Sequence, residues 1–510
     1  MNQTNCSNFS AKPKVSKLRR CMPQIIAVSI KNILLLVYGL TMGMPAMLIP
    51  HLGGGGVDGE TIVLGESGIS WIGSLSFFSV PLGCFASGIV TKPFGRIRAM
   101  QLLCFLFIGA FLLFYFATQA WQVFLGLFLT GFTGGLLEAP TLIYAVEVTE
   151  LGLRGALSST SALAIAIGIL QSFILGSVLP WRTMALINGS IPLAGVFLLF
   201  LIPEPPHGLI RKGQLDKARK SLAWLRGWTT IGNIEKEFQI LLEEIEQKKL
   251  EKTQSVIESI KSYLKPTFLK PFGLVCLTFV LTHFGATQIS IYAVNMFQLL
   301  HVPINSYHAT ILLGFLQMLG CFLLMILVRF LGKRLLSFIA QSGIFIGFLF
   351  TGIYAYSAGA NNFDAANNLN EAIVNKYSWL PLAAIAAVTF CNCLMTSSLP
   401  WIIMGELYPS DIRDTAAGLS AAAGYYIAFL ANKTFLSLIN VVTLAGVFWI
   451  NSCVALLGIV LMYFLLPETE GKHLLEITEH YAGRRKLSNN VRRQKGIDNK
   501  VYEGDCDSKL

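Results

Sequence analysis

Long apolar stretches separated by short polar ones dominate this chain of 510 residues. Each stretch runs for about 20 residues, the length that a helix needs to cross about 30 Å of hydrocarbon. Twelve such stretches are predicted, and they begin near Gln24, Ile69, Ala99, Gln122, Ala156, Met184, Phe272, Tyr307, Leu335, Trp379, Thr415 and Val441. The first stretch is too long for a cleaved signal, so we expect it to be a true first helix.

The polar segments divide these stretches into two sets of six. We expect a cytoplasmic N-terminal tail (1–23), a first six-helix bundle (24–202), a cytoplasmic linker (203–271), a second six-helix bundle (272–466) and a cytoplasmic C-terminal tail (467–510). Within the linker, 214–225 and 234–250 carry apolar residues at helical spacing. The predicted fold class is an all-α membrane protein of twelve transmembrane helices in two pseudo-symmetric bundles.

Composition and charge agree with this architecture. The chain is 54% hydrophobic and 13% charged, and its net charge is +11. The basic residues lie in both tails and in loops on one side, as the positive-inside rule requires of cytoplasmic segments. This spread excludes nucleic acid as a partner and predicts a multi-pass plasma-membrane protein with both termini in the cytoplasm, surrounded by the lipid bilayer.

Cysteines and glycines give no sign of a metal, a cofactor or an enzyme. None of the ten Cys falls in a loop on the outer side, and the pair Cys391 and Cys393 lacks nearby His or acidic partners. The glycines of the fourth and fifth stretches predict close helix contacts rather than a phosphate-binding loop, and these are Gly131, Gly134, Gly135 and Gly168.

Three polar motifs occur twice, in the same order. The first copies are Gly95-Arg96, Glu147 followed by Arg154, and Pro203-Glu204-Pro205. The second copies are Gly332-Lys333-Arg334, Glu406 followed by Arg413, and Pro467-Glu468-Thr469, at offsets of 237, 259 and 264 residues. A parallel repeat in a hydrophobic chain predicts a two-bundle transporter whose similar halves rock about a site held between them.

Taken together, these motifs resemble the sugar-porter family of the major facilitator superfamily, and within it the insect facilitated trehalose transporter-like branch. The most specific segments are Pro203 through Gly227, Glu147 through Gly155, Trp401 through Arg413, and Pro467 through Gly471. The resemblance implies a carrier that moves a small neutral polyol, a sugar such as a hexose or trehalose, by facilitated diffusion with alternating access.

The resemblance also implies a set of substrate-binding residues, although several of the expected amides are missing. Ala162, Leu281 and Gly424 stand where the family has amide side chains. The residues that the resemblance assigns to the substrate are Trp401, Gln317, Gln288, Thr287 and Thr282. The alternative for the two glutamines is hydrogen bonding to neighbouring helices.

A second set of residues is predicted to gate the carrier, and the charges of two loops depart from the family pattern. Lys92 and Arg329 stand where acids are usual, so we expect Glu204 and Glu468 to be the substitute partners of Arg154 and Arg413. The predicted gating residues are Gly95, Arg96, Glu147, Arg154, Glu204, Gly332, Arg334, Glu406, Arg413 and Glu468. The alternative is that Glu204 only caps the helix that it starts.

Two further alternatives concern what the carrier does. Glu138 lies in a predicted span, where a carboxylate is costly, so it is a candidate proton site for a sugar symporter. The first stretch has no Asp or Glu, which favours facilitated diffusion instead. A non-transporting nutrient sensor on the same fold is the other alternative. The sequence leaves open which sugar binds and the oligomeric state.

Overall fold

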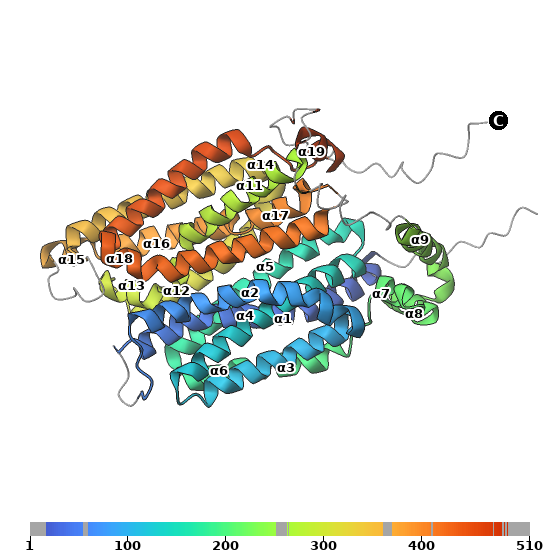
Figure 1. Ribbon diagram of the computed structural model, residues 1–510, viewed down its shortest axis with the longest axis horizontal. Helices are drawn as coiled ribbons and strands as arrows, with labels where there is room; N and C mark the ends of the chain where they lie inside the picture. Colours follow the sequence, from blue (N-terminus) through green and yellow to red (C-terminus); the bar gives the residue numbers. More distant parts are fainter. Residues whose placement is uncertain are drawn as a thin grey trace, which may run out of the picture. The chain divides into compact units, whose positions relative to one another are not determined.

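The computed structural model describes residues 17–54, 60–250, 263, 265–360, 370–409, 412–472, 474–481, 484 and 487. All regular elements in these ranges are helices, and the chain divides into two compact units, Met1–Ser255 and Val256–Leu510 (Figure 1).

Unit 1 contains six long apolar helices and three further helices of 6, 11 and 20 residues. The long helices are α1 (Lys17–Leu52), α2 (Glu66–Phe94), α3 (Arg96–Tyr115), α4 (Ala120–Val148), α5 (Leu151–Val178) and α6 (Trp181–Leu199). Within this unit, α1 packs against α5, α2 against α4, and α3 against both α4 and α6.

Small residues bring these helix pairs into close contact. A Cβ added at Gly168 of α5 would lie 2.1 Å from the Leu36 carbonyl oxygen of α1, and one at Gly135 of α4 would lie 2.1 Å from that of Val80 in α2. The same substitution at Gly131 would meet the Ser76 carbonyl oxygen. The predicted role of these glycines as close helix contacts is therefore confirmed.

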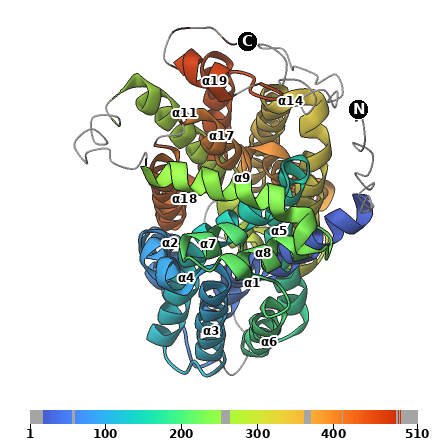
Figure 2. The ribbon, with the colours of Figure 1, turned by 90° about the vertical axis from the view of Figure 1, so that its right-hand side faces the viewer.

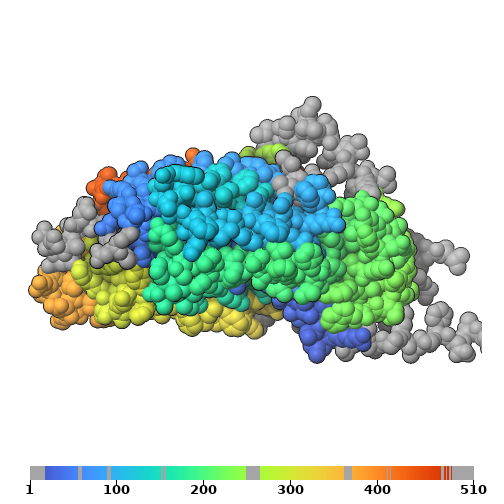
Figure 3. Space-filling view, turned by 90° about the horizontal axis from the view of Figure 1, so that it is seen from below, coloured from blue at the N-terminus to red at the C-terminus, as the bar shows by residue number. Residues whose placement is uncertain are grey.

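The three further helices cover one end of unit 1. They are α7 (Pro206–Arg211), α8 (Leu215–Leu225) and α9 (Ile231–Leu250), and Figures 2 and 3 show them, in green, at that end. Their apolar faces share a small core that includes Ile210, Leu222 and Phe238. The helical spacing seen in the linker sequence therefore marks real amphipathic helices.

Unit 2 contains more interrupted helices. They are α11 (Pro266–Thr282), η1 (His283–Thr287), α12 (Gln288–Ile291), α13 (Ala293–Leu299), α14 (Ser306–Ala358), α15 (Glu371–Tyr377), α16 (Trp379–Cys391), η2 (Asn392–Thr396), α17 (Leu399–Leu407), α18 (Arg413–Leu465) and α19 (Leu474–Tyr481). The π-helical turns η1 and η2 interrupt two membrane spans, and such turns are frequent at functional sites.

The described part of the chain has ten helices that are long and apolar enough to cross a membrane. Two of them, α14 and α18, are 53 residues long and contain one non-helical residue each, Gly332 and Thr443. Splitting these two helices at their kinks turns the ten into the predicted twelve spans.

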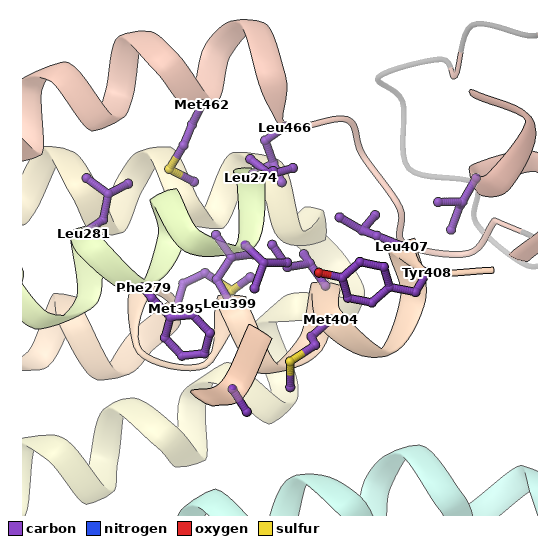
Figure 4. Close-up of a cluster of buried hydrophobic side chains, with 14 of the residues drawn as sticks. Leu274, Phe279, Leu281, Met395, Leu399, Met404, Leu407, Tyr408, Met462 and Leu466 are labelled. Atoms are coloured by element: carbon purple, nitrogen blue, oxygen red, sulfur yellow. The ribbon is translucent and has the colours of Figure 1, made fainter. Parts of the chain in front are cut away.

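The core of unit 2 lies where α11, η2, α17 and α18 meet. Figure 4 shows Phe279 of α11 beside Met395 and Leu399, and Tyr408 beside Leu407. Phe279, Met395 and Leu399 are at most 2% exposed. This packing fixes α11 and α17, the two helices that carry Thr282 and Trp401.

Candidate functional site

The turn between α2 and α3 is held by a carboxylate from a distant motif. Gly95 has φ 92° and ψ 178°, a conformation that favours glycine, and the amides of Arg96 and Ile97 donate to the Glu204 carboxylate at 3.2 and 3.1 Å. Burial raises the pKa of Glu204, although these two amides and the nearby Lys212 oppose the rise. Glu204 therefore caps the free amides at the start of α3.

This cap corrects the expectation that Glu204 acts on the helix that follows it. The N-cap of α7 is Pro205, which makes no side-chain hydrogen bond. The carboxylate satisfies α3 instead, because the free amides of that helix lie within its reach.

Unit 2 repeats the arrangement inside α14. Gly332 has φ 78° and ψ 167°, and the amides of Lys333 and Arg334 donate to the Glu468 carboxylate at 3.2 and 3.0 Å. The sequence repeat is therefore a structural repeat: a glycine turn, two free amides, and a carboxylate from the end of the last span. We call these two arrangements the N-cluster and the C-cluster.

The structure changes one assignment within the repeat. The residue after Gly95 is Arg96, and the residue after Gly332 is Lys333, so Lys333 rather than Arg334 is the equivalent of Arg96. The Arg334 guanidinium donates to the Tyr463 carbonyl oxygen at 2.6 Å and lies over the Phe338 ring. The offset of 237 residues already matched Arg96 to Lys333.

Each cluster also holds a cation against the motif glutamate of a later helix, α4 or α17. In the N-cluster, Arg96 and Glu147 approach to 3.9 Å, and the Glu147 Oε2 atom has no hydrogen-bond partner among the described residues. In the C-cluster, the Lys333 Nζ atom lies 2.6 Å from Glu406 and 3.0 Å from Glu470. Both cations are held within their own unit.

The motif arginine of unit 2, Arg413, is not held by the capping carboxylate Glu468 as we had expected. The side chains of Arg154 and Lys92 lie outside the described residues. The Arg413 guanidinium donates twice to the Tyr408 carbonyl oxygen, at 3.2 Å each. Glu468 receives a third amide, that of Glu470, at 2.9 Å, so hydrogen bonds from the backbone already occupy its carboxylate.

The sequence analysis missed a network that ties α8 and α9 to the membrane helices. Arg226 lies 3.3 Å from Glu150, between α4 and α5, and 2.7 Å from Glu237 of α9. Arg20 and Gln24 of α1 also donate to Glu150, at 2.7 and 3.1 Å. The signal was available, because Arg226 lies in the Leu225-Arg226-Gly227 segment of the resemblance.

The predicted substrate-binding polar residues all bond to neighbours in unit 2. The Gln317 amide donates to the Ser290 hydroxyl at 2.7 Å, and that of Gln288 donates to the Ala431 carbonyl oxygen at 2.9 Å. The Thr282 hydroxyl contacts the Thr278 and Thr396 carbonyl oxygens, and Thr287 contacts that of Thr282 at 3.4 Å. A substrate that uses these groups must replace the bonds shown here.

Trp401 belongs to an aromatic group that the sequence analysis did not foresee. Its ring meets the Phe279 ring edge-on at 5.4 Å and lies 5.7 Å from the Tyr425 ring, while Phe279 stacks on His283. A Cβ added at Gly424 would lie 2.7 Å from the Phe279 ring. The missing side chain at Gly424 therefore makes room for Phe279, so an aromatic surface has replaced an amide.

Two ionisable side chains lie within spans of unit 1. Glu138 accepts a hydrogen bond from the Cys84 thiol at 3.1 Å. Lys31 is fully buried and donates to the Ser161 hydroxyl at 3.0 Å, with no ion pair to a carboxylate in the part of the chain that the structure describes. The sequence analysis overlooked Lys31, although a lone lysine in an apolar helix was a sufficient signal.

An ion pair closes the opposite end of unit 1. The Glu60 carboxylate receives two guanidinium hydrogen bonds from Arg182, at 2.8 and 2.9 Å, and one from the Trp181 indole at 2.9 Å. Burial alone would raise the pKa of Glu60, but these bonds lower it to about 2. The bidentate pair fixes the loop before α2 to the start of α6.

Comparison with known proteins gives consistent matches. The family model described as "Sugar (and other) transporter" matches residues 37–481. The facilitated trehalose transporter Tret1 of Culex quinquefasciatus is 29% identical over 86% of this chain and 80% of that protein. Tret1 of Aedes aegypti is also 29% identical over 86% of this chain, but this chain spans only about half of its length, 52%.

Solved structures agree on the fold. A partially occluded inward-open structure of the xylose transporter XylE from E. coli superposes with a TM-score of 0.69 at 17% identity, covering 89% of this chain and all of that chain. XylE bound to 6-bromo-6-deoxy-D-glucose gives 0.68 at 18% identity, covering 91% of this chain and all of that chain. The predicted fold of two six-helix bundles is confirmed.

Among the described residues, no group of three His, Cys, Asp or Glu is placed to hold a metal ion.

Proposed function

The chain belongs to the sugar (and other) transporter family, and we propose that it carries a small neutral polyol, a hexose or trehalose, across the membrane by facilitated diffusion. The match over residues 37–481 confirms the resemblance drawn from the motifs. The printed names of the relatives, facilitated trehalose transporters, support a sugar as the substrate. Such a carrier works by alternating access and needs no covalent step.

The duplicated cluster is the observation that carries this proposal. Each unit builds the same glycine turn, capped by a carboxylate from the end of its last span, through Glu204 and Glu468. A static channel or a binding module has no need of two such copies, whereas a carrier built from parallel repeats uses equivalent ends in both halves.

We place the protein in the plasma membrane with both termini in the cytoplasm. The excess of Lys and Arg in the tails and in the loops at the two clusters supports this orientation. The N-cluster, the C-cluster and α7–α9 then face the cytoplasm, and the Glu60–Arg182 pair faces outward.

The substrate site proposed here uses Trp401 as an apolar wall and Gln317, Gln288, Thr287 and Thr282 as hydrogen-bonding groups. Sugar rings carry apolar C–H faces that lie well on aromatic side chains, while their hydroxyls need paired donors and acceptors. If the Gln317 amide donates to a substrate hydroxyl instead of Ser290, one hydrogen bond replaces another, at little net cost in free energy.

Uptake of labelled trehalose, glucose and xylose into proteoliposomes tests the proposal. We expect saturable uptake that stops at equal concentrations on both sides. Trp401→Ala should raise the half-saturation concentration about 3- to 10-fold, because the aromatic contact with the substrate is lost. The matched control is Trp379→Ala, since Trp379 is 57% exposed. Binding of substrate without any flux would favour the sensor, and absence of both would contradict the proposal.

A proton-coupled symporter is the second candidate, because two ionisable groups, the half-buried Glu138 and the fully buried Lys31, lie in spans of unit 1. Facilitated diffusion predicts that an imposed proton gradient leaves uptake unchanged in the wild type and in Glu138→Gln. Accumulation of sugar above its external concentration, abolished by a protonophore, would establish the symporter instead.

A further inference from the structure

A cavity lies at the cytoplasmic end of unit 1, between the start of α3 and the helices α7 and α8. Its volume is about 760 Å³, and its walls include Gly95 and Glu204 of the N-cluster. Trp224 of α8 and Phe94 at the end of α2 supply apolar wall, and Phe94 is 50% exposed. The cavity therefore joins the linker helices to the cytoplasmic end of the membrane spans.

Cations dominate this cavity. Its lining contains six basic side chains, Arg96, Arg98, Arg211, Lys212, Lys217 and Lys220, against the single carboxylate of Glu204. Hydrogen bonds from two backbone amides already engage that carboxylate. The lining thus carries a large excess of positive charge inside a concave surface, where the potentials of neighbouring charges add.

The charges lie on α3 at one side of the cavity and on α7, α8 and the turn between them at the other. Arg96 and Arg98 belong to the start of α3, whereas Lys212 follows α7 and Lys217 and Lys220 belong to α8. Like charges facing each other across a cavity repel, so they oppose a close approach of α8 to α3. A multiply charged anion placed between them would replace this repulsion with attraction from both sides.

We propose that this cavity binds a multiply phosphorylated anion, and that the bound anion fastens α7 and α8 to the start of α3. Phosphate oxygens suit this lining, because arginine offers paired donors and lysine offers a mobile point charge. The ligand is either the headgroup of an inositol phospholipid in the adjacent leaflet or a free organic phosphate of the cytoplasm. Binding does not depend on whether the protein carries a sugar.

Direct binding to the purified full-length protein tests the site in two arms. One arm uses nanodiscs of phosphatidylcholine with or without phosphatidylinositol bisphosphate, with phosphatidylserine as the singly charged control lipid. The other arm titrates soluble inositol trisphosphate. Saturable binding in the lipid arm alone assigns a membrane headgroup, and binding in the soluble arm, with competition between the arms, assigns a shared phosphate site. Binding in neither arm would overturn the proposal.

Matched variants locate the site. We expect Lys217→Ala with Lys220→Ala to weaken binding about 30-fold, since each basic residue near an anionic group is worth about 1 kcal/mol. Lys217→Arg with Lys220→Arg should retain binding. The control, Lys236→Ala with Lys270→Ala, removes the same charge from exposed positions outside the cavity and should change binding less than about threefold. Equal losses in the two alanine pairs would mean unspecific attraction to the surface and would overturn the proposal.

Discussion

The N-cluster and the C-cluster share a backbone but differ in how firmly their charges are held. Both place two helix amides on a carboxylate, Glu204 or Glu468, after a glycine with positive φ. The cation–carboxylate distance is 3.9 Å for Arg96 and Glu147 but 2.6 Å for Lys333 and Glu406. The same arrangement therefore has a loose ion pair in the N-cluster and a tight ion pair in the C-cluster.

The cause of the difference lies in the two residues that follow the capping glutamate. In the C-cluster these are Thr469 and Glu470: the Thr469 hydroxyl donates to Glu406 at 2.8 Å, and Glu470 is the second partner of Lys333. In the N-cluster they are Pro205 and Pro206, whose side chains offer no polar atom. A closed hydrogen-bond network stabilises one conformation, whereas a weakly held ion pair permits two conformations. We therefore infer that the N-cluster changes its conformation more readily during transport than the C-cluster.

The largest effect is expected from breaking the shared backbone element. Gly95→Ala forces a side chain into a conformation that costs about 1–3 kcal/mol, and the new Cβ would lie 2.5 Å from the Glu204 carboxylate. Thermal unfolding in detergent should show a clear loss of stability. Gly88→Ala, which meets nothing within 4 Å, is the control. Equal stability of the two variants would show that the cap does not constrain this turn.

The second effect separates the two clusters. Glu406→Gln removes the 2.6 Å partner of Lys333, whose side chain is 6% exposed, and should cost about 2 kcal/mol of stability. Glu147→Gln removes a partner at 3.9 Å and should cost less than about 1 kcal/mol. The two thermal unfolding curves measure the difference directly. A larger loss in Glu147→Gln would reverse the assignment of loose and tight clusters.

A third experiment should convert the loose cluster into the tight form. Pro205→Thr with Pro206→Glu supplies the N-cluster with the hydroxyl and carboxylate that follow the glutamate in the C-cluster, and both residues are favourable at a helix start. We expect about 0.5–1 kcal/mol of added stability and a slower turnover at unchanged substrate affinity. Faster turnover would mean that the prolines themselves restrain the movement.

The smallest effect concerns the Glu60–Arg182 pair, a complete ion pair at the other end of unit 1. Because the pKa of Glu60 is lowered to about 2, its contribution to stability is present above about pH 4.5 and is lost as the pH falls toward 2. Arg182→Lys loses the bidentate contact and should cost about 0.5 kcal/mol at neutral pH. Glu60→Gln should unfold with less dependence on acid over that range. An unchanged acid profile in Glu60→Gln would assign the titration to another carboxylate.

The sequence predicted the spans because their signal is local: about 20 apolar residues in a row form a helix wherever they lie. The residues of the paired motifs lie together in each unit, while their role as a gate stays a prediction. Partners could not be predicted in the same way, because the sequence does not show which backbone amides a carboxylate reaches. Glu204, expected to partner Arg154 or else to cap its own helix, caps α3. Glu468, expected to hold Arg413, holds three amides.

The aromatic group around Trp401 also could not be predicted from the sequence, because its members come from distant parts of the chain. The absence of a side chain at Gly424 was visible in the sequence, but the occupant of that space was not, because Phe279 comes from a helix far away along the chain. The ligand role of Gln317, Gln288, Thr287 and Thr282 stays a prediction. Their hydrogen bonds within unit 2 define what a substrate must displace.

Hydrogen exchange of the capped amides tests the difference between the clusters most directly, because it reports local opening at the residues in question. In proteoliposomes, the amides of Lys333 and Arg334 should exchange at least about tenfold more slowly than those of Arg96 and Ile97, which corresponds to about 1.4 kcal/mol of local stability. Added substrate should change the exchange of Arg96 and Ile97 and leave that of Lys333 and Arg334 unchanged. Equal protection in the two clusters, with equal response to substrate, would contradict the account.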